Sequence, residues 1–150
     1  MEIAKQKIVI VGPAHPFRGG IADTNEAMCR AFLQAGHEAE LITFTVQYPS
    51  LFFPGKTQFS SDPKPEGLKI SRWVHSFNPF NWIASSKKIL KLKPDVIIIR
   101  YWLPLMAPCL GSIALLLGEK VKIIAVADNI IPHEKRMMDS LFTNYFMKGC

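Results

Sequence analysis

Two short runs of consecutive β-branched residues constrain the fold of this chain more than any other feature. Residues 8–11 read Ile-Val-Ile-Val and residues 96–99 read Val-Ile-Ile-Ile, with no polar residue in either run. A strand with one wet face alternates apolar and polar residues, whereas a continuous apolar run is typical of a strand that is buried on both faces. Such strands occur in parallel sheets, because the connecting helices cover both faces. The two runs therefore predict an α/β fold.

Other predicted strands and helices alternate along the chain. Asn78 followed by Pro79 is a typical helix start, a cap and then a first-turn proline. We expect further strands at residues 37–44, 68–74 and 121–126, and helices at residues 21–35, 79–92, 103–117 and 134–148. This alternation implies right-handed crossovers between parallel strands. The expected fold class is a Rossmann-like parallel sheet with helices on both faces.

The segment at residues 48–67 differs from the rest of the chain. It holds prolines at positions 49, 54, 63 and 65 together with several serines. This composition excludes regular secondary structure over most of the segment. A loop of this length in a compact domain is usually functional or mobile.

Composition limits the classes of partner and compartment. The length of 150 residues suits one domain, and the net charge of +6 favours anionic partners. The three cysteines form no CxxC pair and have no histidine cluster nearby, so we expect neither a disulfide framework nor a metal site. No signal peptide is visible at the N-terminus, and the longest apolar stretch, residues 103–117, is shorter than the ~20 residues of a membrane span. These features favour a cytoplasmic protein.

A glycine pair follows the first predicted strand, in the loop at residues 12–20. Ligands of open parallel sheets bind at the carboxyl ends of the strands, where this loop lies. Gly19 and Gly20 would allow a ligand to approach the backbone, the following helix start favours an anion, and Arg18 adds a positive charge. The spacing matches neither GxGxxG nor GxxxxGK[ST], which counts against a dehydrogenase and an NTPase. The alternative is a plain turn that needs glycine for tight packing.

Two further loops are expected at the same edge of the sheet. After residues 96–99, Arg100 and Trp102 form either a wall of an acceptor cleft, with Arg100 facing an anionic group, or an aromatic cap over the sheet edge. After residues 121–126 comes His133, which could donate to a sugar or carry a proton, since the ordinary pKa of a histidine side chain lies near working pH. A purely structural histidine is the alternative.

Four lysines gather on the helix predicted at residues 79–92 and just after it. They are Lys87, Lys88, Lys91 and Lys93. Such a cluster is either a solvated face or a contact with an anionic membrane surface, where each basic residue contributes ~1 kcal/mol. The aromatic residues just before it, Phe77, Phe80 and Trp82, suit peripheral binding to the inner face of the plasma membrane. No nucleic-acid motif is present, so we expect no nucleic-acid partner.

Four stretches, in this order and spacing, resemble one family of proteins. They are Arg-Gly-Gly-Ile at 18–21, Ala-Gly-His-Glu-Ala-Glu-Leu at 35–41, Lys-Pro-Asp-Val-Ile-Ile at 93–98 and Asp-Asn-Ile-Ile-Pro-His-Glu at 128–134. Together they cover nearly the whole chain. The sequence resembles the N-terminal domain of the group 1 family of nucleotide-sugar-dependent glycosyltransferases, which have the GT-B fold.

The resemblance implies a function and a division of labour. The family transfers a sugar from a nucleotide-sugar, a co-substrate and not a cofactor, to a saccharide or lipid-linked acceptor, across a cleft between two Rossmann-like domains. The N-terminal domain holds the acceptor, and the C-terminal domain holds most of the donor. We therefore expect residues 1–150 to be an acceptor-side domain, truncated before its C-terminal partner domain and inactive alone.

The resemblance also implies roles for single residues. Gly19 and Gly20 match the glycine-rich loop that approaches the donor phosphates. His133 matches a position that faces the cleft, and many relatives have a histidine where this chain has Asp128. We expect His133 and Asp128 to be the catalytic candidates, with Asn129 beside them as a substrate contact.

Two other functions are consistent with these residues. One is a free-standing Rossmann-like module that binds an anionic ligand or a partner protein without catalysis. The other is a nucleotide-dependent enzyme of another kind, such as a sugar epimerase or a dehydrogenase, against which the missing GxGxxG counts.

Overall fold

The computed structural model describes residues 4–49, 57–128 and 138–150, and in these ranges strands and helices alternate as the sequence predicts. The strands are β1 (Lys7–Val11), β2 (Glu38–Val46), β3 (Ile70–His75), β4 (Val96–Tyr101) and β5 (Lys122–Ala127). The helices are α1 (Gly20–Gln34), α2 (Pro79–Lys91), α3 (Ala107–Gly118) and α4 (Asp139–Met147), with a short 3-10 helix, η2 (Pro104–Met106), before α3.

The described strands form one sheet in the order β3-β2-β1-β4-β5, and every neighbouring pair is parallel. The chain adds strands to one side of β1 and then crosses to its other side, so β1 lies between β2 and β4. The carboxyl ends of strands at such a switch in strand order are where open α/β sheets bind ligands. The topology therefore places the candidate site beyond the end of β1.

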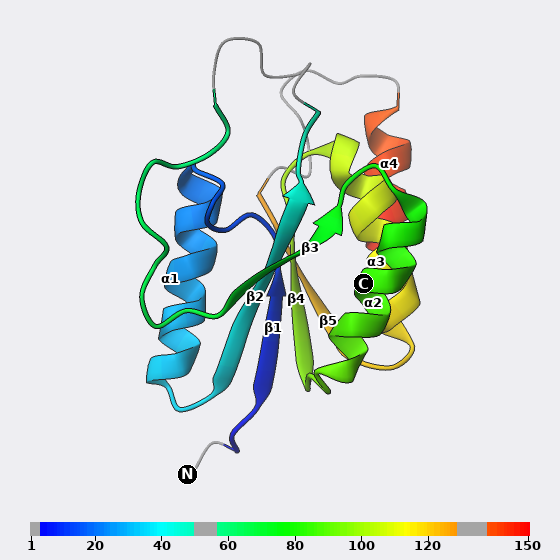
Figure 1. The fold of residues 1–150 in the computed structure, drawn as a ribbon. Coiled ribbons are helices and arrows are strands. Elements are labelled where there is room, and N and C mark those ends of the chain that lie inside the picture. Colours follow the sequence, from blue (N-terminus) through cyan, green and yellow to red (C-terminus); the bar gives the residue numbers. More distant parts are fainter. Residues whose placement is uncertain (1–3, 50–56, 129–137) are drawn as a thin grey trace.

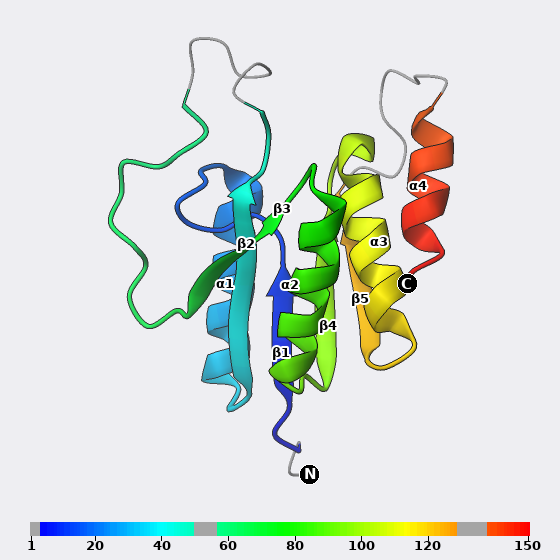
Figure 2. The same cartoon turned by 45° about the vertical axis from the view of Figure 1, so that its right-hand side comes forward.

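Helices cover both faces of the sheet, as expected. Figure 1 shows α1 on one face and α2, α3 and α4 on the other, and Figure 2 shows the second layer turned forward. Successive residues of β1 alternate between the two layers. Ile8 and Ile10 are buried in one apolar cluster with Cys29 of α1, whereas Val9 and Val11 belong to the larger cluster that α2 and α3 complete. Burial on both faces explains why this strand contains no polar residue.

The fourth strand is longer than its apolar run predicts. Strand β4 includes Arg100 and Tyr101, so the expectation that a loop begins at Arg100 is wrong. The Tyr101 ring stacks on Phe146 with 4.3 Å between the centroids, and its hydroxyl pairs with Thr143 of α4 at 2.9 Å. These contacts with a helix far along the chain extend the strand, and no local pattern signals them. Tyr101 is therefore a core residue, whereas its neighbour Trp102 lies at the edge of the sheet and lines the cavity described below.

Helix α2 begins as the sequence predicts, and its buried face differs from the predicted one at Ile83. The Asn78 side chain accepts hydrogen bonds from the backbone N–H groups of Phe80 and Asn81, at 3.1 and 3.3 Å. The sequence predicts Trp82, Ile83 and Leu90 on the inner side of this helix. Trp82 and Leu90 do pack against the core, but the prediction for Ile83 is wrong, because Ile83 is 46% exposed while Ser85 and Ser86 are buried. Ser85 can face the sheet because its hydroxyl donates to the carbonyl of Trp73 at 3.0 Å.

Candidate functional site

A cavity of about 280 Å³ lies beside the glycine loop, at the carboxyl ends of the central strands. Its walls come from segments that are distant in sequence. They are Pro13 and residues 18–22 at the start of α1, Gln47 and Tyr48 after β2, Thr57 and Gln58 further on, and Trp102 after β4. The structure thus brings together four of the predicted site residues: Arg18, Gly19, Gly20 and Trp102.

The backbone N–H groups of the glycine loop divide into two sets. Three N–H groups before the helix donate hydrogen bonds to other residues of the protein. The N–H of Ala14 donates to the Thr43 hydroxyl, that of His15 to the Glu26 carboxylate, and that of Arg18 to the Gln58 carbonyl. The N–H groups of residues 19–22, which are the cap residue Gly19 and the first three residues of α1, donate to no group in the described ranges, and α1 has no side-chain cap. A helix start leaves four N–H groups without intrahelical partners, and their dipoles favour an anion. These four residues line the cavity.

The two glycines do different work in this loop. Gly19 has a φ of +123°, a backbone conformation that is essentially restricted to glycine. Gly20 is already helical, and a Cβ added there would meet nothing within 4 Å. Gly19 is therefore required by the backbone, whereas Gly20 leaves open space at the cavity.

Another part of the cavity wall is a group of hydrogen-bonded side chains around Tyr48. The Trp102 indole N–H donates to the Tyr48 hydroxyl at 2.6 Å, and the Gln47 side chain also hydrogen-bonds to this hydroxyl. Burial raises the pKa of Tyr48 above its ordinary value, and the two hydrogen bonds act in the opposite direction. The Gln58 amide nitrogen donates to the Tyr48 carbonyl at 3.3 Å. Sequence reasoning missed Gln47, Tyr48 and Gln58 as site residues, although the end of β2 was a signal for the first two.

The segment around Phe59 is fixed to the glycine loop. Phe17 and Phe59 form an antiparallel bridge, and the Ser60 N–H donates to the Pro16 carbonyl at 2.7 Å. The two phenyl rings lie 5.3 Å apart, and the Arg72 guanidinium lies within 6 Å of both. This pairing holds the neighbouring residues Thr57 and Gln58, which line the cavity, beside the glycine loop.

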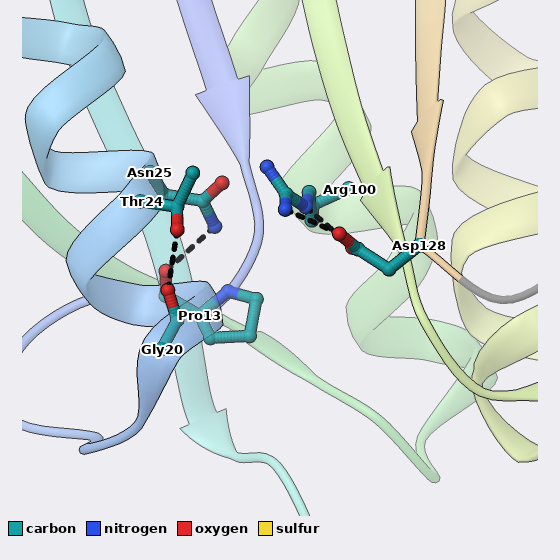
Figure 3. A network of polar contacts seen from close by, with 6 residues as sticks. All are labelled: Pro13, Gly20, Thr24, Asn25, Arg100 and Asp128. Atoms are coloured by element: carbon teal, nitrogen blue, oxygen red, sulfur yellow. Dashed lines mark hydrogen bonds and ion pairs between the residues drawn. The ribbon is translucent and has the colours of Figure 1, made fainter.

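Arg100 and Asp128 form an ion pair near the base of the same loop (Figure 3). Arg100 Nε donates to Asp128 Oδ2 at 2.5 Å, and Nη2 donates to Oδ1. The Arg100 side chain is only 8% exposed and that of Asp128 is 32% exposed. Neither residue lines the cavity, and the anionic group that Arg100 faces belongs to the protein. A substrate contact of Arg100 and a catalytic role of Asp128 stay predictions.

Gly12 and Asn25 connect this ion pair to the cavity. Asn25 is fully buried, and its amide nitrogen donates to the carbonyl of Pro13, a cavity residue, at 2.8 Å. A Cβ at Gly12 would lie 2.8 Å from Asn25 Nδ2 and 2.9 Å from Arg100 Cβ. Figure 3 shows the Asn25 and Arg100 side chains on either side of the chain end of β1. The close packing that the sequence offered as an alternative role for the loop glycines is therefore found at Gly12.

Two of the predicted site residues, His133 and Asn129, lie outside the described residues. The lysines of α2 are in view: Lys87, Lys88 and Lys91 are exposed, and the Lys88 ammonium lies 5.5 Å from the Trp73 ring centroid. Phe80, at the other end of the helix, is 84% exposed. No helix in the described part of the chain combines the length and apolarity that crossing a membrane requires.

Comparison with known proteins finds similarity of fold. No protein-family model and no curated protein sequence matches the chain. The catalytic domain of starch synthase IV from Arabidopsis thaliana, solved with ADP and acarbose, matches with a TM-score of 0.54 and 14% identity over 85% of this chain. UDP-GlcNAc 2-epimerase from Methanocaldococcus jannaschii matches with a TM-score of 0.55 and 14% identity over 97% of this chain.

The chain spans about a third of the length of either structure, 34% and 37% respectively. One match is a synthase and the other an epimerase, so the fold alone does not separate these two activities. The five-stranded parallel sheet and both matches confirm the expected architecture. The chain has the Rossmann-like fold of the N-terminal domain of a GT-B protein.

Proposed function

We propose that this chain is the acceptor-side domain of a glycosyltransferase that moves a sugar from a nucleotide-sugar to a saccharide or lipid-linked acceptor. The observation that carries the proposal is the cavity beside the glycine loop. It lies at the switch in strand order, and its lining includes Arg18 and residues 19–22, whose backbone N–H groups belong to the cap and first turn of α1. A second Rossmann-like domain completes the donor site, so residues 1–150 alone do not turn over.

The chemistry of transfer explains why such a cavity is useful. When the bond between sugar and diphosphate breaks, negative charge develops on the leaving phosphate oxygens. N–H groups and a guanidinium that are fixed in place beforehand stabilise that charge more than they stabilise the uncleaved donor. Arg18 and the start of α1 offer these groups at the protein surface, where a donor held by another domain can reach them.

The catalytic groups in this proposal come from the loop after β5. His133 acts as the proton carrier, and Asn129 contacts the substrate. Asp128 is held by Arg100 at the start of this loop. The ion pair ties the residue that follows β5 to β4.

Gly20→Trp tests the proposal in the enzyme that carries this chain together with its second domain. A Cβ at Gly20 meets no other atom, so the indole can enter the cavity without straining the backbone. We expect sugar transfer to fall at least tenfold while the melting temperature stays the same. Gly20→Ala is the matched control and should retain transfer. Near-normal transfer by Gly20→Trp would contradict the assignment of the loop.

A nucleotide-sugar epimerase is the second candidate, because the epimerase structure matches 97% of the chain. The two activities differ in their need for an acceptor. An epimerase converts UDP-GlcNAc when no acceptor is present, whereas a transferase releases nucleotide in proportion to acceptor glycosylated. Turnover of neither kind by the two-domain protein would favour the non-catalytic binding module.

A further inference from the structure

We propose that the outer face of α2 docks on an anionic lipid bilayer, with Phe80 inserted below the headgroups and Lys87 and Lys91 among their phosphates. This face lies outside the cavity, so the proposal goes beyond the proposed function and assigns a partner to a different surface of the molecule.

Helix α2 leaves large apolar side chains exposed while it buries polar ones. Phe80 is 84% exposed and Ile83, one turn further on, is 46% exposed, whereas Ser85 and Ser86 are buried. A surface helix ordinarily turns its apolar residues toward the core. Apolar side chains that gather on a surface mark a place that a partner or a membrane covers. The first turns of α2 are such a place.

The exposed lysines continue the same face of the helix. Phe80, Ala84, Lys87 and Lys91 follow one another at steps of four, three and four residues, which is the spacing of a single helical face. All four residues are exposed. Phe80 lies in the first turn of α2, and Lys91 is its last residue. The outer face of α2 therefore has an apolar start and a basic end.

Positive charge is concentrated in this part of the chain. Six of the 18 lysines and arginines lie in residues 67–94, whereas all 12 aspartates and glutamates lie elsewhere. No carboxylate in the described ranges pairs with Lys87 or Lys91. Helix α3, which packs beside α2, carries no charged residue. An anionic partner would therefore meet lysines on α2 and no carboxylate on α2 or α3.

A bilayer matches both ends of this face at once. Lysines attract the anionic headgroups, while aromatic and aliphatic side chains enter the boundary with the acyl chains. Duplex nucleic acid offers phosphates but no apolar layer for Phe80 and Ile83. Phe77 is 41% exposed and adds to the apolar end. Trp82 does not, because it packs on the core and its indole N–H donates to the His75 carbonyl at 2.8 Å.

Docking through α2 also orients the cavity. Helix α2 begins after β3, at the carboxyl ends of the strands, and the cavity lies at the same edge of the sheet. Because Phe80 is in the first turn, its insertion brings this edge closer to the lipid than the opposite edge. An acceptor that is anchored in the bilayer would then lie on the side of the cavity.

Sedimentation of the 150-residue chain with vesicles tests the partner. The vesicles contain phosphatidylcholine alone or mixed with phosphatidylserine, and we expect the anionic ones to bind about tenfold more tightly. Phe80→Ala should weaken this binding about tenfold. The matched control Leu33→Ala, on α1 at the other face of the sheet, should not (Figure 1). Equal affinity for both kinds of vesicle, or unchanged binding by Phe80→Ala, would overturn the proposal. Binding of single-stranded DNA without binding of anionic vesicles would identify a nucleic-acid surface instead.

A polarity-sensitive fluorophore tests which face meets the lipid. Cys150→Ser leaves only the buried Cys29 and Cys109, so a label can be attached at Phe80→Cys or, as the control, at Leu33→Cys. Emission from residue 80 should move to shorter wavelengths on anionic vesicles, while emission from residue 33 should not change. An equal shift at both positions would contradict the assigned face. Neither readout needs sugar transfer, so this inference can fail while the proposed function stands, and the reverse.

Discussion

The indole N–H of Trp102 donates to the Tyr48 hydroxyl at 2.6 Å, across 54 residues of sequence. Trp102 follows β4 and Tyr48 follows β2, and these two strands flank β1 on opposite sides. The hydrogen bond therefore joins the two halves of the sheet beyond the end of β1. The Trp102 ring also meets Phe44 edge-on, with 6.0 Å between the centroids. The Trp102–Tyr48 hydrogen bond is part of one wall of the cavity. This wall therefore depends on the strand order, which places the ends of β2 and β4 on either side of β1.

Trp102→Phe tests this contact. The phenyl ring keeps an aromatic surface on Phe44 but loses the N–H donor, so we expect the free energy of unfolding to fall by about 1 kcal/mol. Urea denaturation of Trp102→Phe, Tyr48→Phe and the double variant measures the coupling between the two side chains. Strictly additive effects would show that the hydrogen bond contributes nothing to stability.

Gly12→Ala should destabilise the protein much more than Gly20→Ala. The methyl group at Gly12 would lie under 3 Å from Asn25 and Arg100, which are both buried, so overpacking should cost about 1–3 kcal/mol. At Gly20 the same methyl group meets open space, and alanine favours the helix. Thermal melts of the two variants check the difference. Equal melting temperatures of the two variants would mean that Asn25 and Arg100 can move to accommodate a methyl group at Gly12.

The fold was predictable because its strongest signals are local. The apolar runs of β1 and β4, the Asn78-Pro79 helix start and the alternation of elements lie within short windows of sequence. The errors arose where distant residues decide. Arg100 and Tyr101 join β4 through partners at residues 128, 143 and 146, and Ser85 of α2 is buried because it reaches the carbonyl of Trp73.

The site was predictable only where it follows the ends of strands. The rule that ligands bind at the carboxyl ends of parallel strands identified Arg18 and Trp102, which both line the cavity. It could not identify Gln58, because that residue reaches the cavity through pairing of its segment with the glycine loop. Nor could this rule predict the ion pair between Arg100 and Asp128, because the sequence alone does not show how far apart two side chains at the ends of different strands lie.

Asp128→Asn separates a structural role of this carboxylate from a catalytic one. The change leaves a nearly buried guanidinium without its counter-charge, which costs about 3–5 kcal/mol for a fully buried pair. Asp128 is 32% exposed, so we expect a smaller loss of about 1–3 kcal/mol. Arg100→Met should restore much of the stability of Asp128→Asn, measured by urea denaturation. Unchanged stability with lost transfer in the two-domain enzyme would instead support the catalytic role.

The cysteines should react with iodoacetamide at very different rates. Burial raises the pKa of the Cys29 thiol to about 11 and that of Cys109 also well above its ordinary value, and neither side chain is accessible. Only the thiolate reacts, so both should stay unmodified in the folded protein at about pH 8. Cys150 is exposed, and although burial of its thiol raises its pKa, it should be alkylated first. Peptide mass spectrometry measures the order. Early modification of Cys29 would show that α1 opens from the sheet.

The lysines of α2 should decide whether the chain binds anionic membranes. Lys87 and Lys91 are exposed on the helix that carries the exposed Phe80 at its start, whereas Lys88 contacts the Trp73 ring. If this face meets lipid, Lys87→Glu with Lys91→Glu should abolish sedimentation with phosphatidylserine vesicles, since each basic residue contributes ~1 kcal/mol. Lys120→Glu with Lys122→Glu makes the same charge change at the turn between α3 and β5, away from α2 in sequence, and should leave sedimentation intact. Equal loss in both double variants would show that sedimentation depends on net charge alone. Unchanged sedimentation in the α2 variant would leave its lysines as an ordinary solvated face.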